Sequence, residues 1–192
     1  MLLAACSGSG GSGSAPAGTP SSTASGPTIV GPTIVGPTAS GSASAGGASF
    51  AILPDSVLAA IPPLTYGRDA NADQVMAANG AQPTVNAVFS GGISRSLLYN
   101  GQSVGGIELY RFGPSVTADG RAHYVPLMVE SFAQVTPKPG TLRGTSVEVA
   151  DGARGTAVSV IGWAKGEDVV LVWASGITET QKIAAEYLKL TG

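Results

Sequence analysis

The distribution of charge along the chain limits its fold more than any other feature. Residues 1–54 contain no Asp, Glu, Lys or Arg, and all 22 charged residues, 10 basic and 12 acidic, lie between Asp55 and Lys189. Such a shift in composition separates an uncharged tail from a region of ordinary globular character. The second region, residues 48–192, has about 145 residues, which is long enough to bury one core. We therefore expect one compact domain preceded by a disordered tail.

The overall charge argues against a nucleic-acid-binding protein, and the cysteine content excludes a domain held by internal disulfides. The formal net charge is −2 at pH 7, and the chain has one cysteine. This balance lacks the basic footprint needed to bind a phosphate backbone, so we expect no nucleic-acid partner. A single cysteine cannot form a disulfide within one chain, so packing and hydrogen bonding must stabilise the domain.

The cysteine itself lies in a recognisable setting. The string Leu3-Ala4-Ala5-Cys6, followed by eight Ser and Gly residues, resembles the lipobox of bacterial lipoprotein precursors. The resemblance implies that a diacylglycerol is joined to the Cys6 sulfur and that the precursor is cut before Cys6. It also implies a protein that is anchored to the cell membrane through lipid, on the extracytoplasmic face. No stretch of the sequence has the 18 or more apolar residues that a membrane span needs.

The residues before Cys6 are too few for an export signal. A signal peptide needs a basic segment and an apolar segment of about 7–15 residues, whereas five residues precede Cys6. We expect residues 1–5 to be the remnant of a longer signal peptide whose start lies upstream.

Residues 6–47 are predicted to form a tether. They contain the repeat Gly-Pro-Thr-Ile-Val at residues 26–30 and 31–35, with Gly and Ser on both sides. Proline at every fifth position blocks a helix, and a flexible chain of this length would span roughly 35 Å. The repeats are typical of a plain spacer, and Thr and Ser beside Pro are also typical of an O-glycosylated stalk.

The remaining residues predict an α+β domain. We expect short helices over residues 54–61 and over residues 72–79, the second capped by Asn71. Strands are expected at 84–89, 94–99, 106–112, 145–149, 156–165 and 168–174. A helix with Tyr124, Leu127, Met128 and Phe132 at helical spacing should carry Pro126 in its first turn and end before Pro137, Pro139 and Gly140. A last helix at 179–190 should be capped by Thr178 with Gln181, and should bury Ile183, Ala184, Tyr187 and Leu188.

The order of these elements suggests a repeat. Three strands and a helix are followed by three strands and a helix, with residues 107–112 and 169–174 in matching places. This pattern favours an internal duplication that builds an antiparallel sheet with its helices packed on one face. Because the two halves share a pattern more than identities, chance similarity is the alternative.

The sharpest catalytic motif is a serine pentapeptide. Residues 101–105 match G-x-S-x-G around Ser103, and Asp119 and His123 follow in the order of an α/β-hydrolase triad. A nucleophile elbow needs a strand before the serine and a helix after it, whereas residues 106–112 predict a strand. We therefore interpret residues 101–105 as a hairpin turn, with the triad as the less favoured hypothesis.

Metal and phosphate sites also lack support in the sequence. His123 is the one histidine and Cys6 is expected to be acylated, so a zinc site cannot be assembled from nitrogen and sulfur ligands. Asp151, Glu167 and Asp168 leave an all-carboxylate site open, although acids at hairpin turns are usually solvated. We predict no metal, no cofactor and no enzymatic activity.

Two function hypotheses remain, with a serine hydrolase as a distant third. In the first, the domain is a binding module for a protein or polymer of the cell envelope, and aromatic residues form either its contact surface or, as we favour, its core. These are Tyr99, Tyr110, Phe112, Trp163 and Trp173. In the second, the domain carries a lipid or another hydrophobic ligand. Four valines suit either a packed core or the cavity of such a carrier: Val158, Val160, Val170 and Val172.

Overall fold

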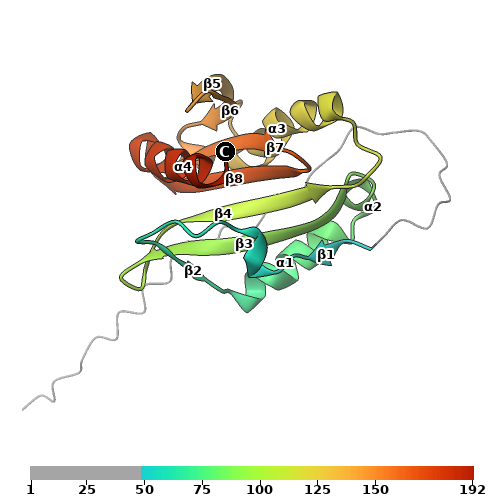
Figure 1. The fold of residues 1–192 in the computed structure, drawn as a ribbon, viewed down its shortest axis with the longest axis horizontal. Coiled ribbons are helices and arrows are strands. Elements are labelled where there is room, and N and C mark those ends of the chain that lie inside the picture. The colour runs from blue at the N-terminus through green and yellow to red at the C-terminus, as the bar shows by residue number, and fades with distance from the viewer. Residues whose placement is uncertain (1–48) are drawn as a thin grey trace, which may run out of the picture.

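A computed structural model describes residues 49–192, which form one eight-stranded sheet. The strands are β1 (Ala51–Ile52), β2 (Thr65–Gly67), β3 (Phe89–Tyr99), β4 (Gln102–Phe112), β5 (Lys138–Leu142), β6 (Thr145–Ala150), β7 (Val158–Lys165) and β8 (Asp168–Ser175). Their order is β1-β3-β4-β8-β7-β6-β5, and β2 also pairs with β3 (Figure 1). All neighbours are antiparallel except β1 and β3, which are parallel. The predicted α+β class with an antiparallel sheet is confirmed.

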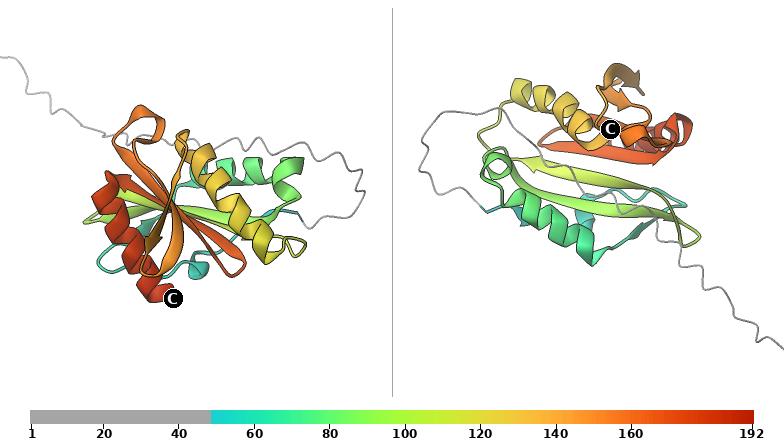
Figure 2. Two further views of the ribbon diagram at one scale, coloured as in Figure 1. Left: turned by 90° about the horizontal axis from the view of Figure 1, so that it is seen from above. Right: turned by 180° about the vertical axis from the view of Figure 1, so that it is seen from behind.

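Four helices cover this sheet on two faces. They are α1 (Ala70–Gly80), α2 (Pro83–Asn86), α3 (Ala118–Ala133) and α4 (Ile177–Thr191), with short 3-10 turns η1 (Asp55–Val57) and η2 (Ala153–Gly155). The buried residues form two clusters, one with α4 and residues 53–64, the other with α1, α2 and α3. We call these sides the α4 face and the α3 face. Figure 2 shows α3 and α4 on either side of the twisted strands.

The expectation that all helices pack on one face is therefore wrong, and β8 shows the physical reason. Val170 and Val172 belong to the core of the α4 face, whereas Val169 and Leu171 belong to the core of the α3 face. All four side chains are at most 1% exposed. A strand that is apolar at every position has two faces to bury, so it needs cover on both.

The predicted duplication is not reproduced either. The hairpins β3–β4 and β7–β8 are joined by pairing of β4 with β8, as a repeat would require. A two-fold axis between these antiparallel strands would place the following helices, α3 and α4, on one face. The two helices instead lie on opposite faces, and both pack on β7 and β8.

Several local predictions fail near Pro and Gly. Residues 84–89 do not form a strand, because Pro83 begins the short helix α2 and β3 begins at Phe89. The pair Gly91-Gly92 does not break β3. A Cβ at Gly91 would lie 2.7 Å from the Ala51 carbonyl oxygen, so glycine here permits the close approach of β1.

The helix boundaries also differ from those predicted. The first predicted helix, residues 54–61, shrinks to η1, and Asp69 rather than Asn71 caps α1 by accepting a hydrogen bond from the Asn71 N–H. Pro126 lies inside α3, which begins at Ala118 after its cap Thr117. Residues 138–142 form the edge strand β5 in spite of Pro139, because an edge strand tolerates proline.

The second half follows its prediction more closely. Strands β6, β7 and β8 and helix α4 lie within a few residues of their expected bounds. The predicted inner face of α4 is confirmed, because Ile183, Ala184, Tyr187 and Leu188 are all buried. The predicted capping box is absent from α4, whose cap position is Gly176.

Candidate functional site

The most deeply buried charge of the described residues is Arg95 of β3, which is 1% exposed. β1 pairs with Gly91 and Gly92, and β2 pairs with residues 96–98, so Arg95 lies at a gap in the cover of the β3 edge. Through this gap its guanidinium reaches two carboxylates, Asp55 of η1 and Asp73 of α1. Arg95 thus connects two segments that lie on opposite faces of the sheet.

Arg95 is held between two carboxylates, one from each face of the sheet. The Nε of Arg95 donates to Asp55 Oδ1 at 2.7 Å, and Nη1 donates to Asp73 Oδ1 at 2.6 Å. Nη1 also donates to the Ser94 carbonyl oxygen at 2.6 Å. Nη2 lies 2.6 Å from the same Asp55 oxygen, as an ion pair without the alignment of a hydrogen bond. Burial lowers the pKa of Arg95, but the hydrogen bonds to Asp73 and Asp55 outweigh it and raise the pKa above its ordinary value.

A second buried polar group lies on the α3 face, at the centre of the sheet. Glu108 of β4 is 5% exposed. Its Oε2 accepts a hydrogen bond from the Tyr110 hydroxyl at 3.1 Å, and its Oε1 accepts one from Ser94 Oγ at 3.3 Å. Burial, and then the charge of Glu108, raise the pKa of Tyr110 well above its ordinary value. Tyr110 is therefore a hydrogen-bond donor at neutral pH rather than a general base.

A third polar contact holds residues 53–64 to the rest of the domain. The Tyr66 hydroxyl donates to the Ala59 carbonyl oxygen. Burial raises the pKa of Tyr187, and a hydrogen bond with the Ala59 backbone opposes this rise. A hydrogen bond that lowers the pKa of a phenol is one donated to its oxygen, so the Ala59 N–H is the donor. The two backbone polar groups of Ala59 are thus bound by tyrosines from β2 and α4.

The structure separates the members of the suspected serine triad. Ser103 is exposed and lies in β4, opposite Leu98, next to the Asn100-Gly101 turn. Asp119 and His123 are exposed on α3, which begins beyond the other end of β4. The nine steps of strand from Ser103 to Phe112 correspond to roughly 30 Å. Ser103 is followed by a strand and not by a helix, as predicted, but the hairpin turn is Asn100-Gly101 and residues 102–105 already belong to β4.

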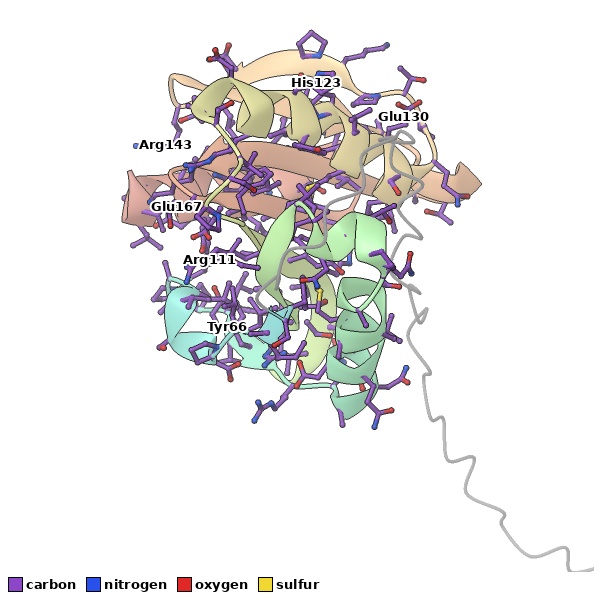
Figure 3. The ribbon with its side chains drawn as sticks, turned by 90° about the vertical axis from the view of Figure 1, so that its right-hand side faces the viewer. Tyr66, Arg111, His123, Glu130, Arg143 and Glu167 are labelled. Atoms are coloured by element: carbon purple, nitrogen blue, oxygen red, sulfur yellow. The ribbon has the colours of Figure 1, made fainter. Side chains whose placement is uncertain are left out.

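The three acids that left a carboxylate site open do not form one group. Asp151 accepts a hydrogen bond from buried Ser159, and Asp168 pairs with Arg111 at 2.9 Å. Figure 3 shows Arg111 beside Glu167, where the end of β4 meets the β7–β8 turn. In the part of the chain that the structure describes, no three His, Cys, Asp or Glu side chains are grouped to hold a metal ion.

The aromatic residues are mainly core residues, as favoured. Tyr110, Phe112 and Trp163 are at most 3% exposed, whereas Tyr99 is 48% exposed at the end of β3. Trp163 packs against Tyr187 with ring centroids 6.0 Å apart, and Trp173 packs against Phe132 at 5.0 Å.

The four valines of the carrier hypothesis do not line one space. Val158 and Val160 contribute to the core of the α3 face, whereas Val170 and Val172 contribute to the core of the α4 face. The sheet lies between the two pairs, so these side chains are used in packing on opposite sides.

Arg95 and Glu108 are the residues that sequence reasoning missed. Each occupies a position between apolar neighbours, Ile93 and Leu97 in one case and Ile107 and Leu109 in the other. A charged residue within such a strand is a signal of a buried ion pair or hydrogen-bonded acid. The partners of Arg95 are 40 and 22 residues away in the chain, so the sequence does not reveal them.

Cys6 and the predicted tether lie outside the described residues. Within residues 49–192, no helix is both long enough and apolar enough to span a bilayer. Comparison of the chain with protein-family models, with curated protein sequences and with solved structures finds no match.

Proposed function

We propose that this chain is a lipid-anchored protein of the extracytoplasmic membrane face whose domain acts as a binding module without enzymatic activity. The observation that carries the anchoring is Leu3-Ala4-Ala5-Cys6, followed by a stretch without charges up to Pro54. The sheet then begins at Ala51, shortly after the predicted end of the tether at residue 47. A lipid anchor, a spacer and a folded domain form the order expected of a module held near a membrane.

The positions of the polar groups support binding rather than catalysis. Arg95 and Glu108, the charged residues most deeply placed in the sheet, are each engaged by neighbouring side chains. The two exposed residues of the hydrolase hypothesis with nucleophilic and basic character, Ser103 and His123, lie on different elements, β4 and α3. A catalytic serine would need a base within hydrogen-bond reach.

Three large apolar side chains are candidates for the contact surface. Tyr99 is 48% exposed, Leu127 is 38% exposed and Leu190 is 45% exposed. They belong to β3, α3 and α4 respectively. Tyrosine is enriched at the centre of protein interfaces because it combines a large apolar area with a hydroxyl group. Tyr99 is therefore the first of the three to test.

The anchor is tested with Cys6→Ser, expressed behind a complete lipoprotein signal sequence. Wild-type protein should enter the detergent phase and carry the mass of a diacylglyceryl cysteine, because two acyl chains give stable attachment at about 0.8 kcal/mol per buried methylene. Cys6→Ser should stay in the aqueous phase with an unmodified mass, while Ser12→Ala, the matched control, should behave as wild type. A wild-type protein that stays aqueous and uncleaved at Cys6 would overturn the anchoring.

The binding role is tested by site-specific photo-crosslinking in whole cells. A photoreactive amino acid is placed at Tyr99, Leu127 or Leu190, and, as controls, at the exposed polar positions Glu179 and Lys182 of α4. A binding module should give a discrete crosslinked product from at least one apolar position and none from the controls. Equal crosslinking from all five positions, or from none, would contradict a defined contact surface. Native mass spectrometry of protein purified from membranes tests the carrier alternative, which requires a bound lipid mass.

A further inference from the structure

We infer that residues 53–64, the segment between β1 and β2, are a strap that opens independently of the rest of the domain. The strap contains η1 and lies on the α4 face, where Figure 1 shows it crossing β3 and β4. The helix of that face, α4, packs on β7 and β8. The strap is thus the segment that completes the cover of β3 and β4 on this face.

Apart from Arg95, which binds Asp55 of the strap, the strand residues under the strap are apolar. Ile93 and Leu97 of β3 and Ile107 and Leu109 of β4 are at most 2% exposed and share one core cluster with the strap. The strap contributes Leu58, which is 7% exposed, and Ile61, which is 3% exposed. Opening would present four side chains of the sheet to solvent, so the open state exposes a surface that the closed state lacks.

The backbone of the strap is bound mainly to itself. The N–H groups of Val57, Leu58 and Leu64 donate to carbonyls within the strap, those of Pro54, Asp55 and Ile61. Leu53 N–H donates to Gly92 in the sheet, at the edge where the strap begins. A segment with few long-range backbone bonds belongs to the low-stability end of a protein and can open before the sheet unfolds.

Side chains close the strap at two points. The first is the ion pair of Asp55 with Arg95, and the second is Ala59, which is held by Tyr66 and Tyr187. The first point is built so that release leaves no stranded charge. The Asp55 side chain is already 51% exposed, and Arg95 keeps Asp73 at 2.6 Å when Asp55 leaves. An ion pair that strands a buried charge on breaking is costly to break, and this pair avoids that cost.

Hydrogen exchange on the full chain tests the inference. The amides of Val57, Leu58 and Leu64 are hydrogen-bonded in the strap, and those of Val170 and Leu171 lie in the central strand β8. An opening strap predicts exchange at least about 100-fold faster for the strap amides, with a weaker dependence on denaturant. Equal exchange rates and equal denaturant slopes for the two sets would overturn the inference.

Variants of the closing contacts sharpen this test. Asp55→Asn should raise exchange of the strap amides about tenfold and leave the β8 amides unchanged. Glu186→Gln, which removes one partner of an exposed ion pair with Lys189 on α4, is the control and should change neither set. If Asp55→Asn raises both sets equally, the contact belongs to the whole fold and the strap is not a separate unit.

Thiol labelling gives a second measurement that needs no change at the closing contacts. In a Cys6→Ser background, Ile61→Cys reports on the strap and Ile161→Cys on β7; the native side chains are 3% and 1% exposed. Opening of the strap predicts labelling of Cys at position 61 at least about tenfold faster than at position 161. Equal labelling rates would overturn the inference.

Discussion

The two central hairpins of the sheet differ in how they are covered. The hairpin β7–β8 has a helix on each face, α3 on one and α4 on the other. The hairpin β3–β4 has α1 on the α3 face and the strap of residues 53–64 on the α4 face. Both hairpins bury apolar residues on both faces, so the demand for cover is the same. The two hairpins differ in whether a helix or an irregular segment covers the α4 face.

The connections that follow each hairpin explain the difference. A single residue, Gly176, lies between β8 and α4, so α4 must fold back on its own hairpin. Gly176 has a φ of 79° and a ψ of 153°, a conformation that residues with a Cβ rarely adopt. Residues 113–117 connect β4 to α3, and this longer link lets α3 pass to the neighbouring hairpin. The β3–β4 hairpin therefore has no helix of its own after it.

The largest expected effect is the difference in stability loss between removing a leucine on α4 and removing a leucine in the strap. Leu188 and Leu58 are both 7% exposed and belong to the same core cluster. Leu188→Ala should lower the free energy of unfolding by about 2–4 kcal/mol, because a buried leucine loses its transfer energy and leaves a cavity. Leu58→Ala should cost less, because its effect cannot exceed the free energy of opening the strap. Denaturant titration of both variants measures the difference, and equal losses would remove the distinction between the two covers.

The next effect concerns the contact of α3 with β7. A Cβ at Gly162 would lie 2.5 Å from Val129 Cγ2 and 2.7 Å from Leu171 Cδ2. Gly162→Ala should therefore lower the free energy of unfolding by about 1–3 kcal/mol through overpacking. Gly140 in β5 is the control, because a Cβ there would meet side chains at an ordinary 3.6 Å. If thermal unfolding shows the same loss for both glycines, α3 does not press on this hairpin as closely as the distances indicate.

A third effect uses alkaline pH to probe the point where the strap meets α4. Burial, and then the nearby Tyr187, raise the pKa of Tyr66 above its ordinary value of 10.0. A raised pKa favours the neutral phenol in the folded state, so the stability is fully present below pH 10 and is lost as pH rises above it. Above pH 10, Tyr66→Phe should reduce the slope of stability against pH by at most about 1.4 kcal/mol per unit. Urea titrations at pH 8 and above pH 10 provide the comparison, and an unchanged slope would show that Tyr66 is not buried under the strap.

The sequence predicts the second hairpin better than the first. Between residues 145 and 191 the apolar run of β8 and the helical period of α4 are long and uninterrupted, so tertiary context does not change them. In the first half, the pair Gly91-Gly92 lies between two predicted strands, yet it is part of one continuous strand, β3, because β1 packs against it. These glycine positions are decided by a neighbour that is distant in the chain.

The buried polar contacts are likewise set by long-range packing that the sequence does not show. Asp55, Asp73 and Arg95 are each visible as charged residues, but the gap at the edge of β3 that brings them together depends on where β1 and β2 end. Ala59 carries no signal in the sequence, because its role lies in its backbone carbonyl and N–H groups. Long-range contacts of this kind follow from topology, which local patterns do not determine.

The smallest expected effect concerns the suspected serine and histidine of the hydrolase hypothesis, which lie on the β3–β4 hairpin and on α3. Ser103 is at the tip of the β3–β4 hairpin, and His123 is on α3, which packs on the β7–β8 hairpin. Both are exposed, so Ser103→Ala and His123→Ala should each change the free energy of unfolding by less than about 0.5 kcal/mol. Because a strand of roughly 30 Å separates the tip from the start of α3, His123 cannot activate the Ser103 hydroxyl in this fold. Ser103 should therefore not react with a fluorophosphonate probe, and intact mass after incubation should equal that of the Ser103→Ala control. A serine-specific adduct at Ser103 would require the two hairpins to approach in a second conformation, and it would restore the hydrolase hypothesis.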